Sequence, residues 1–227
     1  MKKSREKSVS FQQKEDKKFG SQPSAFPKFK NSWLSTPFHS VFLIAAMFGR
    51  GLTQEPRKVM LEGLLTLVIL QGFFGYFITL KKEETEKKVK AKSEKLTKGF
   101  IYTLLLSFPI CLLLFLFGAP FDYKVIETYI LACHLSFLIT YPLLILYDFD
   151  FTIVSQLVAL DDALKIVARN QILLSSCMTA VGAWLGVIPI PLDWDRDWQQ
   201  WPLTLLCGAY VGSFLGGISS LLIGNLL

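Results

Sequence analysis

The stretch IPIPLDWDRDWQQWP, residues 188–202, lies between two long apolar segments that contain regularly spaced glycines. Tryptophan concentrates in the headgroup layer of a bilayer, whereas charged side chains are excluded from its hydrocarbon core. The stretch is therefore typical of a short loop at a membrane surface. Within nine residues it holds three tryptophans, three aspartates and one arginine: Asp193, Trp194, Asp195, Arg196, Asp197, Trp198 and Trp201.

The composition of the whole chain also indicates a membrane protein. Apolar residues make up 52% of the 227 residues, and lysine clusters near the N-terminus and in residues 81–98. The net charge of +6 comes without an aromatic–basic motif or zinc-ligand spacing, so it favours an anionic lipid surface over nucleic acid. The four cysteines lie in apolar segments without CxxC spacing and are predicted to be buried free thiols.

A transmembrane helix needs about 20 mostly apolar residues. The sequence predicts an all-α integral membrane protein, a bundle of about six transmembrane helices over residues 33–227, preceded by a disordered basic tail over residues 1–32. The first candidate is the weakest, because its apolar core covers only residues 41–48, and it could instead lie along the membrane surface or re-enter it. The candidate spans lie near residues 34–53, 59–80, 99–118, 123–146, 171–191 and 202–225.

The distribution of lysine and arginine predicts the orientation of the bundle. With six spans, the segments on the side of the N-terminus carry 19 of the 24 basic residues, and the loops on the other side carry five. Positive charge is enriched in cytosolic segments. Both termini are therefore expected in the cytosol, with residues 188–202 on the opposite side.

Two stretches carry a resemblance to a known family. Residues 182–202, GAWLGVIPIPLDWDRDWQQWP, resemble the signature of the phosphatidylinositol glycan class F (PIG-F) family. FGAP at residues 117–120, followed by Glu127 and Thr128, is similar to a second part of the family pattern. The resemblance covers roughly residues 36–225, and the chain is identified as a fungal-type member.

The resemblance implies a multi-pass endoplasmic reticulum protein of glycosylphosphatidylinositol (GPI) anchor synthesis. Family members are understood as non-catalytic subunits that stabilise ethanolamine phosphate transferases and assist phosphoethanolamine addition to GPI mannose. The expected partners are therefore transferase catalytic subunits, with phospholipid or GPI lipid as a further contact. The chain has only two histidines, His39 and His134, and no hydrophilic domain of its own for two zinc sites. We expect no enzyme activity, catalytic residue, metal site or cofactor.

The alternative is a small intramembrane lipid transferase or lipid carrier that uses Glu127 and residues 193–197. The D-x-D-x-D pattern of these aspartates begins like a calcium-binding EF-hand loop, but the sixth and twelfth positions are Trp198 and Thr204 instead of Gly and Glu. A carboxylate pair that binds metal for phosphoryl transfer remains an alternative. The favoured prediction is a folded loop that presents itself to a partner or a lipid headgroup, with aspartates that pair Arg196 or cap backbone amides.

Glu127 lies near the start of the fourth apolar segment, where an ionisable group is costly and often functional. It could pair with Lys124, three residues earlier, or form a polar relay with His134, two helical turns further on. For His134, a single hydrogen bond to a neighbouring helix is the simpler expectation.

Glycines spaced four residues apart predict close helix packing in the last two apolar segments. Such small residues let two helix backbones approach each other. The glycines could pack against each other within the chain, or against the transmembrane helices of a partner. They are Gly182 and Gly186 in the fifth segment and Gly208, Gly212 and Gly216 in the sixth.

Overall fold

The computed structural model describes residues 31–85, 92–150, 163–192 and 196–226. Within these ranges the chain forms helices and no strand, as the sequence predicts. The predicted disordered tail lies almost wholly outside the described residues. The α-helices are α2 (Phe38–Gly49), α3 (Pro56–Thr85), α4 (Lys92–Leu116), α5 (Val125–Tyr147), α7 (Ala163–Arg169), α8 (Gln171–Leu185) and α9 (Leu203–Leu226), and the short 3-10 helices are η1 (Trp33–Ser35) and η2 (Asp197–Gln199).

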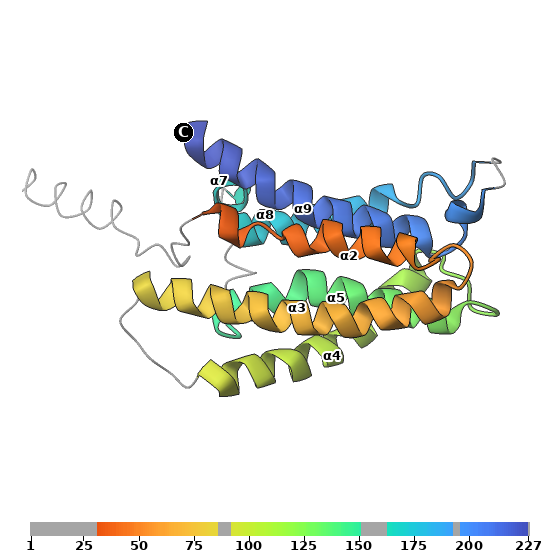
Figure 1. The fold of residues 1–227 in the computed structure, drawn as a ribbon, viewed down its shortest axis with the longest axis horizontal. Coiled ribbons are helices and arrows are strands. Elements are labelled where there is room, and N and C mark those ends of the chain that lie inside the picture. The colour runs from red at the N-terminus through yellow and green to blue at the C-terminus, as the bar shows by residue number, and fades with distance from the viewer. Residues whose placement is uncertain (1–30, 86–91, 151–162, 193–195, 227) are drawn as a thin grey trace, which may run out of the picture.

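The chain reverses direction between successive long helices, so the bundle has two distinct ends (Figure 1). One end holds the connections at residues 50–55, 117–124, 186–192 and 196–202, and is called the loop end. The opposite end holds residues 31 and 226, the first and last that are described, and is called the tail end (Figure 1). The described parts of the two stretches that carry the resemblance, residues 117–120 and 182–202, therefore reach the same end of the molecule.

Among the described residues, four helices are long and apolar enough to cross a membrane: Pro56–Lys81, Ser93–Leu116, Val125–Tyr147 and Leu203–Ile223. The candidates near residues 34–53 and 171–191 form shorter helices, α2 with 12 residues and α8 with 15. At 1.5 Å per residue these two helices are about 18 and 22 Å long. A bilayer has a hydrocarbon core of about 30 Å. The prediction of six full-length spans thus holds by length and composition for four segments.

Local sequence explains why α2 and α8 are short. Pro37 precedes α2, and Gly51, with φ +87°, turns the chain just after it. At the start of α8, the Asn170 side chain accepts hydrogen bonds from the backbone N–H groups of Ile172 and Leu173 and so caps the helix. At its end, two prolines at positions 189 and 191 prevent further helical hydrogen bonding.

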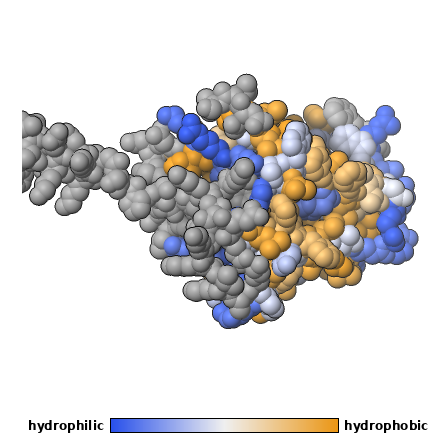
Figure 2. Space-filling view, turned by 60° about the vertical axis from the view of Figure 1, so that its left-hand side comes forward, coloured by the Kyte–Doolittle hydropathy of each residue, from blue (hydrophilic) through white to orange (hydrophobic). Residues whose placement is uncertain are grey.

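The outer surface of the bundle is strongly apolar. On the face shown in Figure 2, apolar side chains cover the middle of the molecule, and hydrophilic side chains gather toward the loop end. Of the four long apolar helices, α4 is the least covered by the rest of the protein. Only 22% of its apolar window is buried, whereas 78% of the window in α5 is buried. Helix α5 is therefore the central helix, and it packs against α3, α4, α8 and α9. This arrangement fits a multi-pass membrane protein.

Helices α8 and α9 pack backbone to backbone through their glycines. A Cβ atom at Gly182 would lie 2.1 Å from the Gly208 carbonyl oxygen, and one at Gly212 would lie 2.1 Å from the Met178 carbonyl oxygen. Gly186 and Gly216 meet the backbone of the facing helix in the same way. The chain itself covers the glycine faces, so a partner's helices would reach these glycines only if α8 and α9 separated.

At the tail end, a fully buried glutamine joins the N-terminal segment to α8 and α9. The Gln171 side chain accepts a hydrogen bond from the Ser32 backbone N–H at 3.0 Å. Its amide group donates to the Thr36 hydroxyl at 2.8 Å and to the Gly217 carbonyl at 3.1 Å. This network fixes the entry of the chain into the bundle, and nothing in the residue spacing predicted it.

Candidate interaction site at the loop end

The predicted acidic and aromatic loop is described from Arg196 onward. Asp193, Trp194 and Asp195 lie outside the described residues. Arg196 precedes η2, Asp197 begins it, and both side chains are exposed. No group of three or more His, Cys, Asp or Glu side chains that could hold a metal ion occurs in the part of the chain that the structure describes.

A buried glutamine folds this loop back on itself. The Gln199 amide group donates hydrogen bonds of 2.8 Å to the carbonyl oxygens of Pro189 and Leu192. Its own carbonyl oxygen accepts a 3.0 Å bond from the Arg196 backbone N–H. One side chain therefore links residues on both sides of the turn. Sequence reasoning missed this role, because a glutamine between tryptophans gives no periodic signal.

Trp201 joins the two stretches that carry the family resemblance. Its indole N–H donates a 2.9 Å hydrogen bond to the Thr128 hydroxyl on α5. The Thr128 hydroxyl in turn donates to the Lys124 carbonyl at 2.8 Å. The sequence predicted that Trp201 anchors the loop at the lipid interface, but its polar atom is used inside the protein. Trp198 is the more exposed of the two indoles.

A third loop is tied to the same place. The Gln200 amide group donates a 2.7 Å hydrogen bond to the Thr53 carbonyl oxygen, in the connection between α2 and α3. The adjacent side chains Gln200 and Trp201 thus link three connections: the one that leads into α9, the α2–α3 connection and the α4–α5 connection. These bonds are partly buried and help to position the loops, since breaking them leaves polar groups unpaired.

Glu127 is buried at the loop end, with 5% of its surface exposed. It pairs with Arg57 of α3, whose Nε and terminal nitrogen each lie 3.1 Å from the carboxylate Oε1. The alternative in which Glu127 pairs with Lys124 is wrong: the carboxylate pairs with Arg57, which reaches across from the first turn of α3, while Lys124 precedes the first turn of α5. The second carboxylate oxygen, Oε2, has no protein partner among the described residues.

His134 joins three helices in the core. The Tyr210 hydroxyl of α9 lies 2.7 Å from Nδ1, and the Met60 carbonyl oxygen of α3 lies 3.0 Å from Nε2. Because a carbonyl only accepts, Nε2 carries the proton and Nδ1 accepts from Tyr210. Both ring nitrogens are used in these bonds. The predicted relay between His134 and Glu127 therefore has no nitrogen available to it.

The family of the chain follows from comparison with known proteins. The model of the GPI biosynthesis protein family Pig-F matches residues 35–221. The chain belongs to this family. The match spans the bundle and both resembling stretches, with Glu127, Thr128 and the loop from Arg196 to Trp201 inside it. The expected family membership is confirmed, and the loop-end contacts described above are contacts between residues of the Pig-F region.

Fungal relatives in the Pig-F family match nearly the whole chain. Glycosylphosphatidylinositol anchor biosynthesis protein 11 of Debaryomyces hansenii is 45% identical over an alignment 226 residues long, and the alignment covers 95% of each chain. The protein of the same name from Candida albicans is 36% identical over 87% of this chain and 82% of its own. No solved structure gives a significant match. Both relatives are named for the biosynthesis of GPI anchors.

Proposed function

We propose that this protein is a non-catalytic subunit of the ethanolamine phosphate transferases of GPI-anchor biosynthesis, in the endoplasmic reticulum membrane. It would bind and stabilise the catalytic subunits and so assist phosphoethanolamine addition to GPI mannose. Membership of the Pig-F family supports the process, since the relatives carry its name. The observation that carries the accessory role is the bonding of the motif residues to one another at the loop end.

This bonding favours a scaffold over an enzyme. The hydrogen bonds that hold the three connections together use the side-chain polar atoms of Gln199, Gln200, Trp201 and Thr128. Nucleophilic catalysis needs a nucleophile with an oriented base within hydrogen-bond reach. His134 is the histidine nearest to the motif residues in sequence, and it is engaged by Tyr210 and Met60 inside the bundle. This bonding supports the proposal that the motif acts as a preformed binding surface.

The loop end is proposed to face the lumen. It carries few basic residues, while the tail-end segments carry most of the 24 lysines and arginines, as expected for the cytosolic side. Arg196, Asp197 and Trp198 are exposed on this end and would contact a lumenal domain of the partner. Arginine and tryptophan are enriched among the residues that dominate protein interfaces.

A pull-down from mild detergent, followed by mass spectrometry, tests the proposal. Charge reversal by Arg196→Glu is expected to lower the recovery of the transferase subunits without lowering the amount of this protein. The matched control is Lys98→Glu, a charge reversal at an exposed side chain of α4 near the tail end. Recovery of the wild-type protein alone, from cells with intact transferase activity, would exclude an accessory subunit.

One observation keeps a second function open. The Oε2 atom of Glu127 is buried without a protein partner among the residues described, as expected if a ligand or proton used it. A lipid transferase or lipid carrier would use Glu127 together with residues 193–197. Glu127→Gln would then abolish the GPI product while the complex stays intact. In a scaffold, the same change leaves the product unchanged, or reduces product and complex together.

A further inference from the structure

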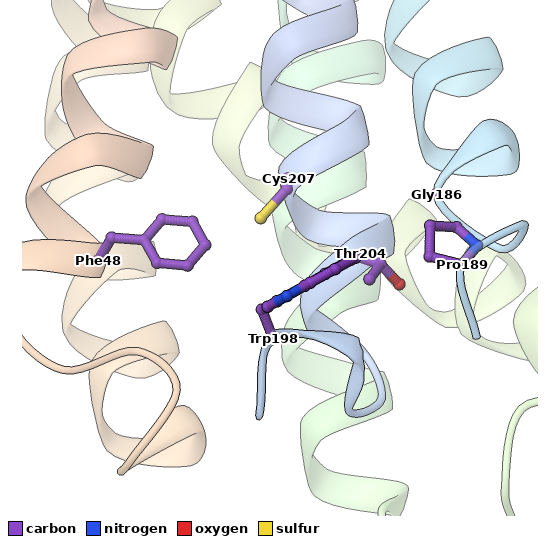
Figure 3. Close-up of a pocket in the computed structure, with 6 residues that line it drawn as sticks. All are labelled: Phe48, Gly186, Pro189, Trp198, Thr204 and Cys207. Carbon is purple, nitrogen blue, oxygen red and sulfur yellow. The ribbon is translucent and has the colours of Figure 1, made fainter. Parts of the chain in front are cut away.

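A cavity of about 470 Å³ lies beside the loop end, between α2, α8, η2 and α9. Its size is within the range of about 300–1,000 Å³ that is usual for ligand pockets. Figure 3 shows the Phe48 ring pointing from α2 toward α9, from which Cys207 and Thr204 project. The side chains around the cavity are almost entirely apolar: Phe48, Gly186, Pro189, Trp198, Thr204 and Cys207.

The Thr204 hydroxyl is the exception among these groups. Threonine side chains inside helices usually donate to the carbonyl four residues earlier, as Thr66, Thr128 and Thr179 do here. Thr204 is the second residue of α9, so the carbonyl four residues earlier belongs to Gln200, outside the helix. Its Oγ1 is buried and has no hydrogen-bond partner in the described part of the protein. A buried donor of this kind favours a ligand with an acceptor oxygen.

The cavity adjoins exposed apolar side chains of α9. Helices α2 and α9 run antiparallel, since the Phe38 and Phe214 rings are 5.6 Å apart at one end and Phe48 and Cys207 line the cavity at the other. On α9, exposed apolar side chains continue from Cys207 toward the tail end at helical spacing, with Val211 and then Leu215. Lipid tails cover such a surface in a bilayer, so a molecule that enters the cavity from this side is a lipid.

The position of the polar groups indicates how the lipid is oriented. Trp198 lies at the loop end of the cavity, and indoles prefer the headgroup layer of a membrane. Thr204 lies beside it, at the start of α9, so an acceptor oxygen near the loop end of a bound lipid would be close to its hydroxyl. Among the residues that the structure describes, no lysine, arginine or carboxylate lines the cavity. A site without charged groups does not select a headgroup, which favours an abundant bilayer lipid over a rare glycolipid.

We propose that this cavity binds one acyl chain of a bilayer phospholipid. The chain runs from the cavity along α2 and α9, and its ester carbonyl accepts a hydrogen bond from the Thr204 hydroxyl. The bound lipid fills the gap between the end of α2 and the Trp198 loop. The lining named above comes from this chain alone, so the isolated protein is expected to bind the lipid without a transferase partner.

Photocrosslinking tests the proposal on the full-length protein in phosphatidylcholine nanodiscs. The probe is a phosphatidylcholine with a diazirine in one acyl chain, and crosslinked peptides are mapped by mass spectrometry. We expect crosslinks on the peptides that contain Phe48 and Cys207. Cys207→Phe fills the cavity and should abolish them. Leu222→Phe, at an exposed position of α9 near the tail end, is the matched control and should leave them unchanged.

A second variant covers the case in which Cys207→Phe fails to fold. Thr204→Val keeps the shape of the side chain and removes the hydroxyl, and should lower the fraction of protein that retains one phospholipid in native mass spectrometry after detergent washing. Equal crosslinking of the wild-type protein and a folded Cys207→Phe would overturn the proposal. So would cavity crosslinks that form with a photoreactive GPI precursor but not with phosphatidylcholine, because the occupant would then be a glycolipid.

Discussion

The indole N–H of Trp201 lies 2.9 Å from the hydroxyl oxygen of Thr128, and 73 residues of sequence separate the two. This contact joins the loop before α9 to the first turn of α5. The Thr128 hydroxyl donates a hydrogen bond to the Lys124 carbonyl, and the Gln200 amide group donates one to the Thr53 carbonyl in the loop before α3. These loops therefore form one hydrogen-bonded unit. Removing one of the bonds should also destabilise the other loops of the unit.

Trp201→Phe tests this unit, because it removes the N–H and keeps most of the ring. A hydrogen bond contributes about 1 kcal/mol to stability. We expect a loss of that size, measured as a lower unfolding temperature in detergent, together with faster proteolysis of the loop. Trp33→Phe is the control, since Trp33 is an exposed indole at the tail end. Equal behaviour of the two variants would mean that the Trp201 contact carries no stability.

The Arg57–Glu127 pair allows a double-mutant test. Arg57→Met leaves the buried Glu127 carboxylate without its cation. The cost should exceed the roughly 1 kcal/mol of an exposed pair, but stay below the 3–5 kcal/mol seen when a buried pair is broken, because the Arg57 side chain is 57% exposed. Adding Glu127→Gln should restore most of the lost stability. If the double variant is as unstable as the sum of the single ones, the two side chains do not act as a pair.

The hydrogen bonds of His134 connect α5 to α3 and α9. Tyr210→Phe removes the donor to Nδ1 and keeps the ring. Interhelical hydrogen bonds in membrane proteins contribute about 0.6 kcal/mol on average and up to about 1.7 kcal/mol. We expect a loss in this range in reversible unfolding in detergent micelles. His134→Phe removes both bonds, so it should cost more than Tyr210→Phe. The reverse order would contradict the bonding described here.

The glycine packing of α8 and α9 has a built-in control. Gly212→Ala would place a methyl group 2.1 Å from the Met178 carbonyl oxygen, so the helices must move apart. Overpacking of this kind typically costs about 1–3 kcal/mol. At Gly49, the last residue of α2, an added Cβ meets nothing within 4 Å. Gly49→Ala should therefore leave the unfolding temperature unchanged, and a similar drop in both variants would rule out close packing as the cause.

Patterns along the sequence predicted the helices better than the contacts between them. The apolar length of the segments and the four-residue glycine spacing are local properties, so they could be read without knowledge of the fold. The partner of Glu127 was predicted wrongly because Lys124 is near in sequence, while Arg57 is 70 residues away and is brought close only by packing of α3 on α5. The role of Gln199 also depends on how the loop closes, which no periodicity encodes.

The lengths of α2 and α8 show a second limit of such patterns. Hydropathy counts apolar residues but does not locate helix ends. The ends here are set by Pro37, the Asn170 cap and the turn at Gly51. Short helices still fit a bundle in which the flanking segments, Trp33–Ser35 and residues 186–192, extend the chain toward the two ends.

The orientation of the bundle is the prediction on which the proposed function most depends, and glycosylation can measure it. The sequence contains no Asn-x-Ser/Thr acceptor site of its own, so inserted sites report without background. A flexible cassette with one acceptor site, inserted between Asp122 and Tyr123, should be glycosylated, because the α4–α5 connection lies at the loop end. The same cassette at the N-terminus should stay unmodified, since the tail end carries the excess of lysine and arginine. The opposite pattern would turn the exposed Arg196 and Trp198 toward the cytosol, away from a lumenal transferase domain, and the accessory role would lose its binding surface.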